Sequence, residues 1–187
     1  MRNPEVLIAC IGNIFLGDDG FGTEVARELA GRSLPPGVVV KDFGIRGFDL
    51  TYALLDPYRL IILVDACQRG GRPGTLYLLE PDPIGADAAS GAPPRLDTHA
   101  MNPMAVLRVV HSLGGSPARI LIVGCEPADI GTDEADGKLG LSEPVQAAAG
   151  DAIALIERTI AKFFDTDEAG LKLQLVEESN YGQSTEL

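Results

Sequence analysis

The chain has 187 residues, of which 45% are hydrophobic and 22% are charged. This length fits one domain around a single core, and the composition excludes a chain that is disordered throughout. Fifteen Lys and Arg residues against 27 Asp and Glu residues give a net charge of -12, so nucleic-acid binding is not expected.

Short apolar runs alternate with longer amphipathic segments along the chain. Five runs have the character of strands, at residues 6–11, 38–42, 60–64, 75–79 and 120–124. Apolar spacing predicts helices at residues 23–31, 48–55, 101–113 and 142 to about 164. This alternation is typical of an α/β fold, here a three-layer αβα sandwich whose mostly parallel, five-stranded twisted sheet carries helices on both faces.

The last predicted helix has a clear start. Ser142 takes the N-cap position, Glu143 lies at the positive end of the helix dipole and Pro144 fits the first turn. Beyond the helix, residues 165–187 carry six acids and one Lys. We therefore expect one α/β domain over residues 1–164 and an acidic, mobile tail over residues 165–187.

The cysteines and the N-terminus bear on where the protein works. Cys10, Cys67 and Cys125 stand apart in apolar runs and make neither a disulfide framework nor a paired metal motif. Reduced thiols in the cytoplasm are the expected state. The apolar N-terminal run lacks a cleavage site, so it predicts a strand and not a signal peptide. No apolar run approaches the roughly 18–20 residues of a membrane span. We also expect the protein to be a monomer.

Polar side chains gather at the expected carboxyl ends of the strands, or in loops that can reach them. They are Asp18, Asp19, Asp42, Asp65, His99 and Glu126. Ligands bind at this edge of an open α/β sheet, near the point where the strand order reverses. If the order begins 2-1-3, a crevice opens between Asp19 and Asp65.

One histidine and two carboxylates in such a crevice form a mixed nitrogen and oxygen donor set. Asp19, Asp65 and His99 suit a divalent ion such as Ni, Zn, Mn or Fe. Three protein ligands leave open positions for water or substrate. Without a cation the two carboxylates repel each other, and the pKa of one of them rises.

Each of these residues also has a purely structural interpretation. Asp18 or Asp19 could cap the helix that follows, and Asp65 could belong to a strand-terminal turn. His99 could simply stand at a helix start. Asp42 could only anchor the glycine-containing turn after it.

The glycine-rich segment at residues 12–22 has a competing interpretation as a phosphate loop. Its spacing is not GxGxxG, it lacks GK[ST], and two aspartates stand where phosphate charge would lie. A flavodoxin-like nucleotide-binding protein is therefore disfavoured. The sequence also lacks the GxSxG and HExxH motifs, and nothing specifies a cysteine nucleophile paired with His99.

An ordered set of motifs resembles that of the hydrogenase maturation endopeptidases, the proteases that trim the C-terminus of the large subunit of nickel–iron hydrogenases. The motifs are Gly12-Asn13-x-x-x-x-Asp18-Asp19-Gly20-x-Gly22, Leu63-Val64-Asp65-Ala66, the segment at His99, Gly124-Cys125-Glu126-Pro127 and Leu141-Ser142-x-Pro144-Val145. The resemblance covers residues 4 to 162.

The resemblance implies that Asp19, Asp65 and His99 bind nickel. The nickel is brought by the substrate, and another divalent cation could take its place. The first-loop ligand of the family is often Glu, so the shorter Asp19 would draw the metal closer to that loop. We expect the resting enzyme to hold little or no metal.

The family also has an Asp-Gly-Gly-Thr-x-Gly turn after its second strand, which falls on residues 42–47. Asp42 matches it and becomes the candidate catalytic residue of an aspartyl-type endopeptidase, with Gly44 and Gly47 as candidate substrate-binding residues. Phe43 and Ile45 depart from the pattern, and the family's threonine hydroxyl is absent.

The resemblance therefore implies a cytoplasmic endopeptidase. Its partner is the nickel-loaded precursor of a hydrogenase large subunit, from which it removes the C-terminal extension. The alternative is a nickel-binding maturation checkpoint or chaperone that uses the same site and cuts nothing.

Overall fold

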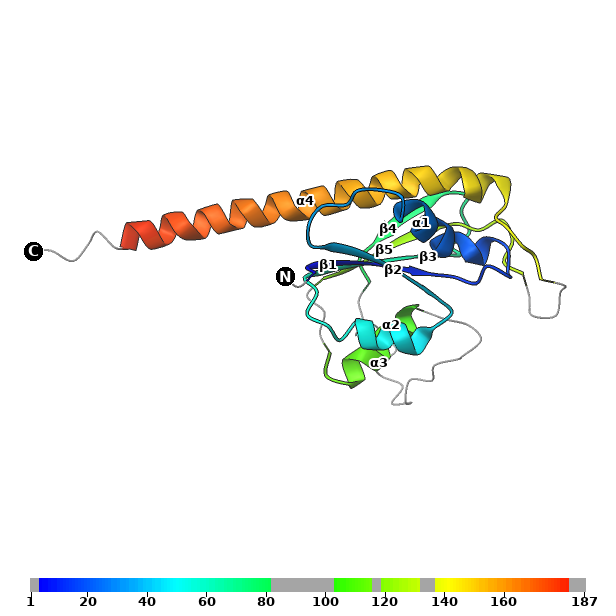
Figure 1. Cartoon of the computed structure of the whole chain (residues 1–187), viewed down its shortest axis with the longest axis horizontal. Coiled ribbons are helices and arrows are strands. Elements are labelled where there is room, and N and C mark those ends of the chain that lie inside the picture. Colours follow the sequence, from blue (N-terminus) through cyan, green and yellow to red (C-terminus); the bar gives the residue numbers. More distant parts are fainter. Residues whose placement is uncertain (1–3, 82–102, 116–118, 132–136, 182–187) are drawn as a thin grey trace, which may run out of the picture. The chain divides into compact units, whose positions relative to one another are not determined.

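The computed structural model describes residues 4–81, 103–115, 119–131 and 137–181. The chain divides into two compact units, Met1–Ile153 and Ala154–Leu187. The first unit contains the whole sheet and the candidate site (Figure 1). The second unit, where described, is the continuation of the last helix.

A single five-stranded sheet forms the centre of the first unit. Its strands are β1 (Val6–Ile11), β2 (Val38–Gly44), β3 (Leu60–Ala66), β4 (Leu76–Leu79) and β5 (Ile120–Cys125). The strand order is β2-β1-β3-β5-β4. The pairs β1–β2, β1–β3 and β3–β5 are parallel, and β4 joins β5 antiparallel. The predicted mostly parallel sheet is confirmed.

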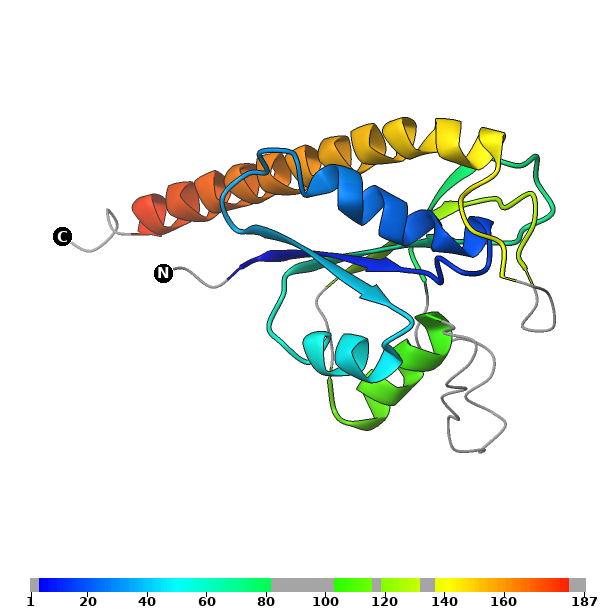
Figure 2. The same ribbon diagram turned by 45° about the vertical axis from the view of Figure 1, so that its right-hand side comes forward.

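Helices cover both faces of the sheet. They are the 3-10 turn η1 (Asp18–Gly20), α1 (Phe21–Leu29), α2 (Gly47–Ala53), α3 (Pro103–Ser112) and α4 (Glu143–Tyr181). Helix α1 lies on one face, and α2 and α3 lie together on the other (Figures 1 and 2). Near its start α4 contacts α1, where Gln146 Nε2 donates to Glu24 Oε1 at 3.2 Å. This arrangement confirms the predicted αβα layers.

Strand β1 shows why these runs form the centre of the sheet. All six of its residues are buried. Alternate residues point to opposite faces of a strand, and Leu7, Ala9 and Ile11 pack in the cluster that includes residues of α2 and α3. Val6, Ile8 and Cys10, which point to the other face, are fully buried too. An uninterrupted apolar run is therefore the pattern of a strand covered on both sides.

Gly22 allows α1 to lie directly against the sheet. A Cβ atom at this position would stand 2.1 Å from the Ile11 carbonyl oxygen and 2.4 Å from that of Val64. Any side chain there would force the helix away from the ends of β1 and β3. This close approach keeps the preceding turn, and with it Asp19, at the edge of the sheet.

Helix α4 continues to Tyr181, beyond its predicted end near Phe164. The added residues include Glu, Ala, Leu, Lys and Gln, which favour helix although the segment is polar. The boundary of the two units falls after Ile153, within α4, and the predicted division at residue 164 stays a prediction. The mobility predicted for residues 165–187 stays a prediction. In the described ranges no helix is long and apolar enough to cross a bilayer.

Candidate functional site

The candidate site lies at the carboxyl edge of the sheet, between β1 and β3. Strand order β2-β1-β3 confirms the order on which the predicted crevice depends. From β1 the chain turns through α1 to β2 on one side, whereas from β3 it proceeds towards β4 and β5 on the other. This is the switch point where open α/β sheets bind ligands.

Asp19 and Asp65 are brought together at this point. Asp65 is buried at the end of β3, with an exposed fraction of 8%. Burial, and after it the charge of Asp19, raise the pKa of Asp65 well above its ordinary value, although the Ala66 N–H donates to Oδ1 at 2.9 Å. Burial also raises the pKa of Asp19, although the Asn13 N–H, which donates to its Oδ2 at 3.0 Å, acts to lower it. The pair therefore favours a proton or a cation.

The backbone before Asp19 is shaped by Gly12. Its φ is +149°, and a Cβ atom would stand 2.1 Å from the Asp19 carbonyl oxygen. Only glycine leaves room for the chain to fold back here. The glycine-rich segment therefore forms a tight turn that places Asp19, in η1, against β3.

Asp18 does not cap a helix, and neither does Asp19, because no side chain caps η1 or α1 at Gly17 or Gly20. The interpretation of Asp18 and Asp19 as helix caps is therefore wrong. Asp19 instead accepts from the Asn13 N–H, and Asp18 binds two segments far away in the sequence.

The Asp18 carboxylate is a buried hydrogen-bond hub, with an exposed fraction of 1%. Its Oδ2 accepts from the N–H groups of Ala128 and Asp129 at 2.8 and 3.1 Å and from Ser142 Oγ at 2.9 Å, and its Oδ1 accepts from the Ser142 N–H at 2.6 Å. Burial alone would raise the pKa of Asp18, but these hydrogen bonds together hold it below its ordinary value. Ser142 occupies the predicted N-cap position, since its carbonyl accepts from the Gln146 N–H, yet its hydroxyl donates to Asp18.

Asp42 anchors a turn, as one interpretation of the sequence expected. Its Oδ1 accepts from the Gly44 N–H at 2.9 Å and from Thr23 Oγ1 at 3.3 Å. Arg46 donates to its backbone carbonyl. The Asp42 side chain is exposed, and its backbone lies opposite Cys10 in the parallel pairing of β1 and β2. Because β1 separates β2 from β3, Asp42 lies one strand further from Asp65 than Asp19 does.

Phe43 and Ile45 depart from the family's Asp-Gly-Gly-Thr-x-Gly pattern in the turn at residues 42–47, and the structure shows where each side chain lies. Phe43 is buried in the apolar cluster beneath α2 and α3, whereas Ile45 is 55% exposed. Gly44 has a φ of +53°, which glycine adopts without strain. The turn is therefore held by packing of Phe43 and by Asp42.

Glu126 organises the connection between β3 and β4. It is buried, and its carboxylate accepts from the N–H groups of Arg69 and Gly70 and, at 2.7 Å, from the Tyr77 hydroxyl. The Tyr77 hydrogen bond and then the backbone N–H groups lower the pKa of Glu126, although burial acts the other way. Glu126 therefore remains an anion that shapes the loop. Nothing in the sequence indicated Tyr77, because it lies 49 residues from its partner.

The thiols are poor nucleophiles. Cys10 and Cys125 are buried and Cys67 is half-buried, and all three are free. Burial raises the pKa of each thiol, that of Cys125 to about 12. Cys10 and Cys125, both fully buried, therefore serve as small apolar residues of the core.

His99, the third predicted ligand, lies outside the described residues. Within the described ranges no group of three or more His, Cys, Asp or Glu side chains is placed to hold a metal ion. The carboxylate pair Asp19 and Asp65 is thus the part of the predicted donor set that the structure brings together.

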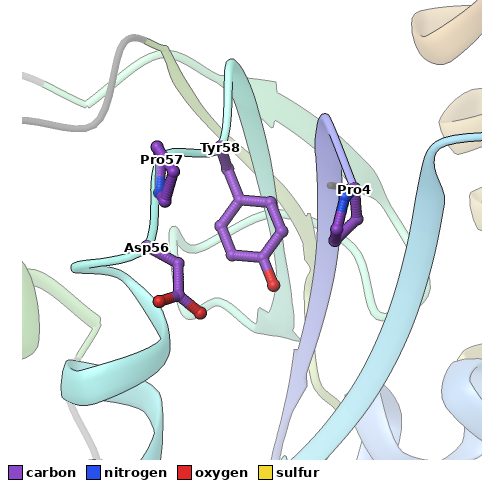
Figure 3. Close-up of a pocket in the computed structure, with 4 residues that line it drawn as sticks. All are labelled: Pro4, Asp56, Pro57 and Tyr58. Carbon is purple, nitrogen blue, oxygen red and sulfur yellow. The ribbon is translucent and has the colours of Figure 1, made fainter. Parts of the chain in front are cut away.

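A small cavity lies at the opposite, amino end of the sheet. Pro4, Asp56, Pro57 and Tyr58 line it, and its volume is about 180 Å³. Figure 3 shows the Tyr58 ring pointing towards Pro4. Sites for drug-sized ligands are larger, at about 300–1,000 Å³. This cavity is far along the strands from the carboxylate pair and does not contribute to the candidate site.

Fold and site thus define an α/β protein with two neighbouring carboxylates, Asp19 and Asp65, at the switch point of its sheet. Comparisons with known proteins identify its family. The HycI family model, described as hydrogenase maturation protease, matches residues 23–159. A hydrogenase maturation protease from Methanocaldococcus jannaschii is 32% identical over 163 residues, which is 87% of this chain and all of that one.

Solved structures give the same result. The hydrogenase 2 maturation peptidase from Thaumarchaeota archaeon SCGC_AB-539-E09 is 31% identical, with a TM-score of 0.62 over 83% of this chain and 97% of that one. The hydrogenase maturating endopeptidase HybD of E. coli shares the fold, with a TM-score of 0.65 at 23% identity over 87% and 93% of the two chains. The chain belongs to the hydrogenase maturation protease family and is a peptidase.

Proposed function

We propose that the protein removes the C-terminal extension from the nickel-loaded precursor of a nickel–iron hydrogenase large subunit. It would do so in the cytoplasm and as a monomer. The observation that carries the proposal is the coupled pair of Asp19 and Asp65 at the switch point of the sheet. Asp65 is buried and Asp19 is half-buried, and two neighbouring carboxylates with raised pKa values suit a cation that arrives with the substrate.

The donor set suits a metal that remains partly bound to the substrate. Two carboxylates and the His99 imidazole would fill only part of a nickel coordination shell, and the substrate's own ligands would complete it. The protease would then recognise nickel insertion as a coordination event. Nickel is thus part of the substrate, and another divalent cation could occupy the same donors.

The turn after β2 would receive the segment to be cut. Asp42 holds this turn through its bond to the Gly44 N–H, and Gly44 and Gly47 would contact the extended peptide. We propose that the scissile carbonyl lies near Asp42, or near a water that Asp42 orients. An Asp42→Asn variant keeps the acceptor oxygen for Gly44 but removes the charge. We expect this variant to fold normally and to lose at least tenfold in kcat.

The decisive test is a cleavage assay on the nickel-loaded precursor, with mass spectrometry of the released peptide. Asp19→Ala and His99→Ala should abolish cleavage, because each removes one of three donors. His111→Ala is the matched control, since His111 is exposed on α3 and is the other of the two histidines of the chain. Full cleavage by both Asp19→Ala and His99→Ala would contradict the proposed site.

The same assay separates the second candidate function. A nickel-binding checkpoint would bind the loaded precursor with the same dependence on Asp19 and His99 but would release no peptide. The family relationship to peptidases favours cleavage.

A further inference from the structure

The loop that follows Asp65 is built as a rigid platform. Glu126 accepts from the Arg69 N–H at 2.9 and 3.1 Å and from the Gly70 N–H at 3.0 Å. The Cys67 N–H donates to the Cys125 carbonyl at 2.8 Å, which continues the β3–β5 pairing past the end of the strand. The backbone around Arg69 is therefore fixed to β5.

The platform also fixes the direction of the Arg69 side chain. The Arg69 guanidinium lies over the Tyr77 ring, with its Cζ atom 5.7 Å from the ring centroid. The Tyr77 hydroxyl is itself bound to Glu126 at 2.7 Å. Gly71 is required beside it, because a Cβ atom there would stand 2.1 Å from that hydroxyl oxygen. Stacking on an anchored ring restricts the guanidinium without using its N–H donors.

The guanidinium lies close to the candidate site. Arg69 follows Asp65 by four residues, and the Cys67 N–H between them is held to the Cys125 carbonyl at 2.8 Å. Cys67 is therefore the common neighbour of the buried carboxylate and the exposed cation. The exposed Arg69 side chain therefore lies on the loop that directly follows Asp65.

Arg69 differs in its partners from several other cations of the described chain. Five of these cations are paired with acids, namely Arg27 with Glu24, Arg46 with Asp49, Arg59 with Glu5, Arg119 with Glu80 and Lys138 with Asp129. Within the described ranges, the side-chain partners of Arg69 are the Tyr77 ring and the Cys67 thiol. Glu126 binds the Arg69 backbone and not its guanidinium.

We infer that Arg69 is a specificity-determining residue that binds a carboxylate of the substrate segment entering the crevice. This inference rests on the proposed function and adds the chemistry that the protease selects. In a chain with a net charge of -12, an acidic segment would be repelled unless a cation received it. The planar guanidinium matches a carboxylate in a bidentate manner.

The test compares Arg69→Gln with Arg72→Gln, a matched change at another exposed arginine of the same loop. For each variant, the Kd for the loaded precursor and the KM and kcat of its cleavage are measured. Arg69→Gln should weaken binding and raise KM about tenfold with kcat unchanged. The effect of salt on KM should decrease in this variant, and Arg72→Gln should behave as wild type. Arg69→Lys should retain part of the affinity, which excludes misfolding as the cause.

Precursor variants identify the carboxylate. In one set each acidic side chain of the cleaved segment is changed to its amide, and in another the chain is extended by one neutral residue to move its terminal carboxylate. The precursor change that removes the carboxylate bound by Arg69 should not weaken binding or raise KM any further in the Arg69→Gln variant. Wild-type KM in Arg69→Gln, or losses that add fully with every precursor variant, would overturn the inference. Binding without cleavage by wild type contradicts the proposed function instead, while the effect on Kd still tests Arg69.

Discussion

Replacement of Asp18 by alanine should destabilise the protein strongly. The buried carboxylate accepts four hydrogen bonds, from the N–H groups of Ala128, Asp129 and Ser142 and from the Ser142 hydroxyl. A hydrogen bond to a charged group contributes about 1.5–3 kcal/mol, and such contributions are not additive within one network. Buried N–H and O–H donors left without an acceptor cost about 1–3 kcal/mol each, so together they give about 3–5 kcal/mol when the contributions are not fully additive. We expect a loss in this range, from a total stability of about 5–15 kcal/mol.

Urea unfolding followed by circular dichroism measures this loss. With a slope of about 2 kcal/mol per molar urea, a loss of about 4 kcal/mol lowers the unfolding midpoint by about 2 M. Asp129→Ala is the control, because Asp129 makes an exposed ion pair with Lys138, and its midpoint should hardly change.

The pH dependence provides a second measure of the same group. The pKa of Asp18 is lowered in the folded protein, so its stabilisation is present above the unfolded pKa and is lost as the pH falls through the folded pKa. The urea midpoint of wild type should therefore fall on acidification more steeply than that of Asp18→Ala. A midpoint for Asp18→Ala within 0.5 M of wild type, about 1 kcal/mol on the same slope, would refute the hub assignment.

Four further changes test other parts of the protein. Asp65→Asn should stabilise the metal-free protein at neutral pH. The pKa of Asp65 is raised in the folded protein. As the pH rises from the unfolded to the folded pKa, the free energy of unfolding of wild type should therefore fall by up to about 1.4 kcal/mol per pH unit. Urea unfolding at a series of pH values should not find this fall in the variant. Gly22→Ala should lower the free energy of unfolding by about 2 kcal/mol or more, since its Cβ would overlap two carbonyl oxygens. Gly150→Ala, in open space on α4, should instead raise it by about 0.5–1 kcal/mol in the same assay. Tyr77→Phe should raise the pKa of Glu126, measurable by NMR titration, because the hydroxyl is the main cause of its lowering.

The sequence predicted the sheet well because its strands carry a strong local signal. Residues 6–11 of β1 and residues 60–64 of β3 form uninterrupted apolar runs, and only burial on both faces explains such runs. The approach of Asp19 to Asp65 followed from topology, since parallel neighbours end at the same edge. This part of the site needed no knowledge of side-chain geometry.

Contacts between distant segments could not be predicted in the same way. Asp18 binds residues 110 to 124 positions away, and no periodicity records such a pair. A cap was therefore the natural local expectation, and it was wrong. The end of α4 was missed for another reason, because hydrophobicity was low where helix propensity was still sufficient.

The central claim is that Asp19, Asp65 and His99 share one metal ion. Crystals of the protein with Ni²⁺, measured on both sides of the nickel absorption edge, test it most directly. The account predicts one anomalous peak at the carboxyl edge of β1 and β3, about 2 Å from a carboxylate oxygen of each aspartate and from a ring nitrogen of His99. Nickel bound elsewhere, or at Asp19 and Asp65 with His99 remote from it, would contradict the claim.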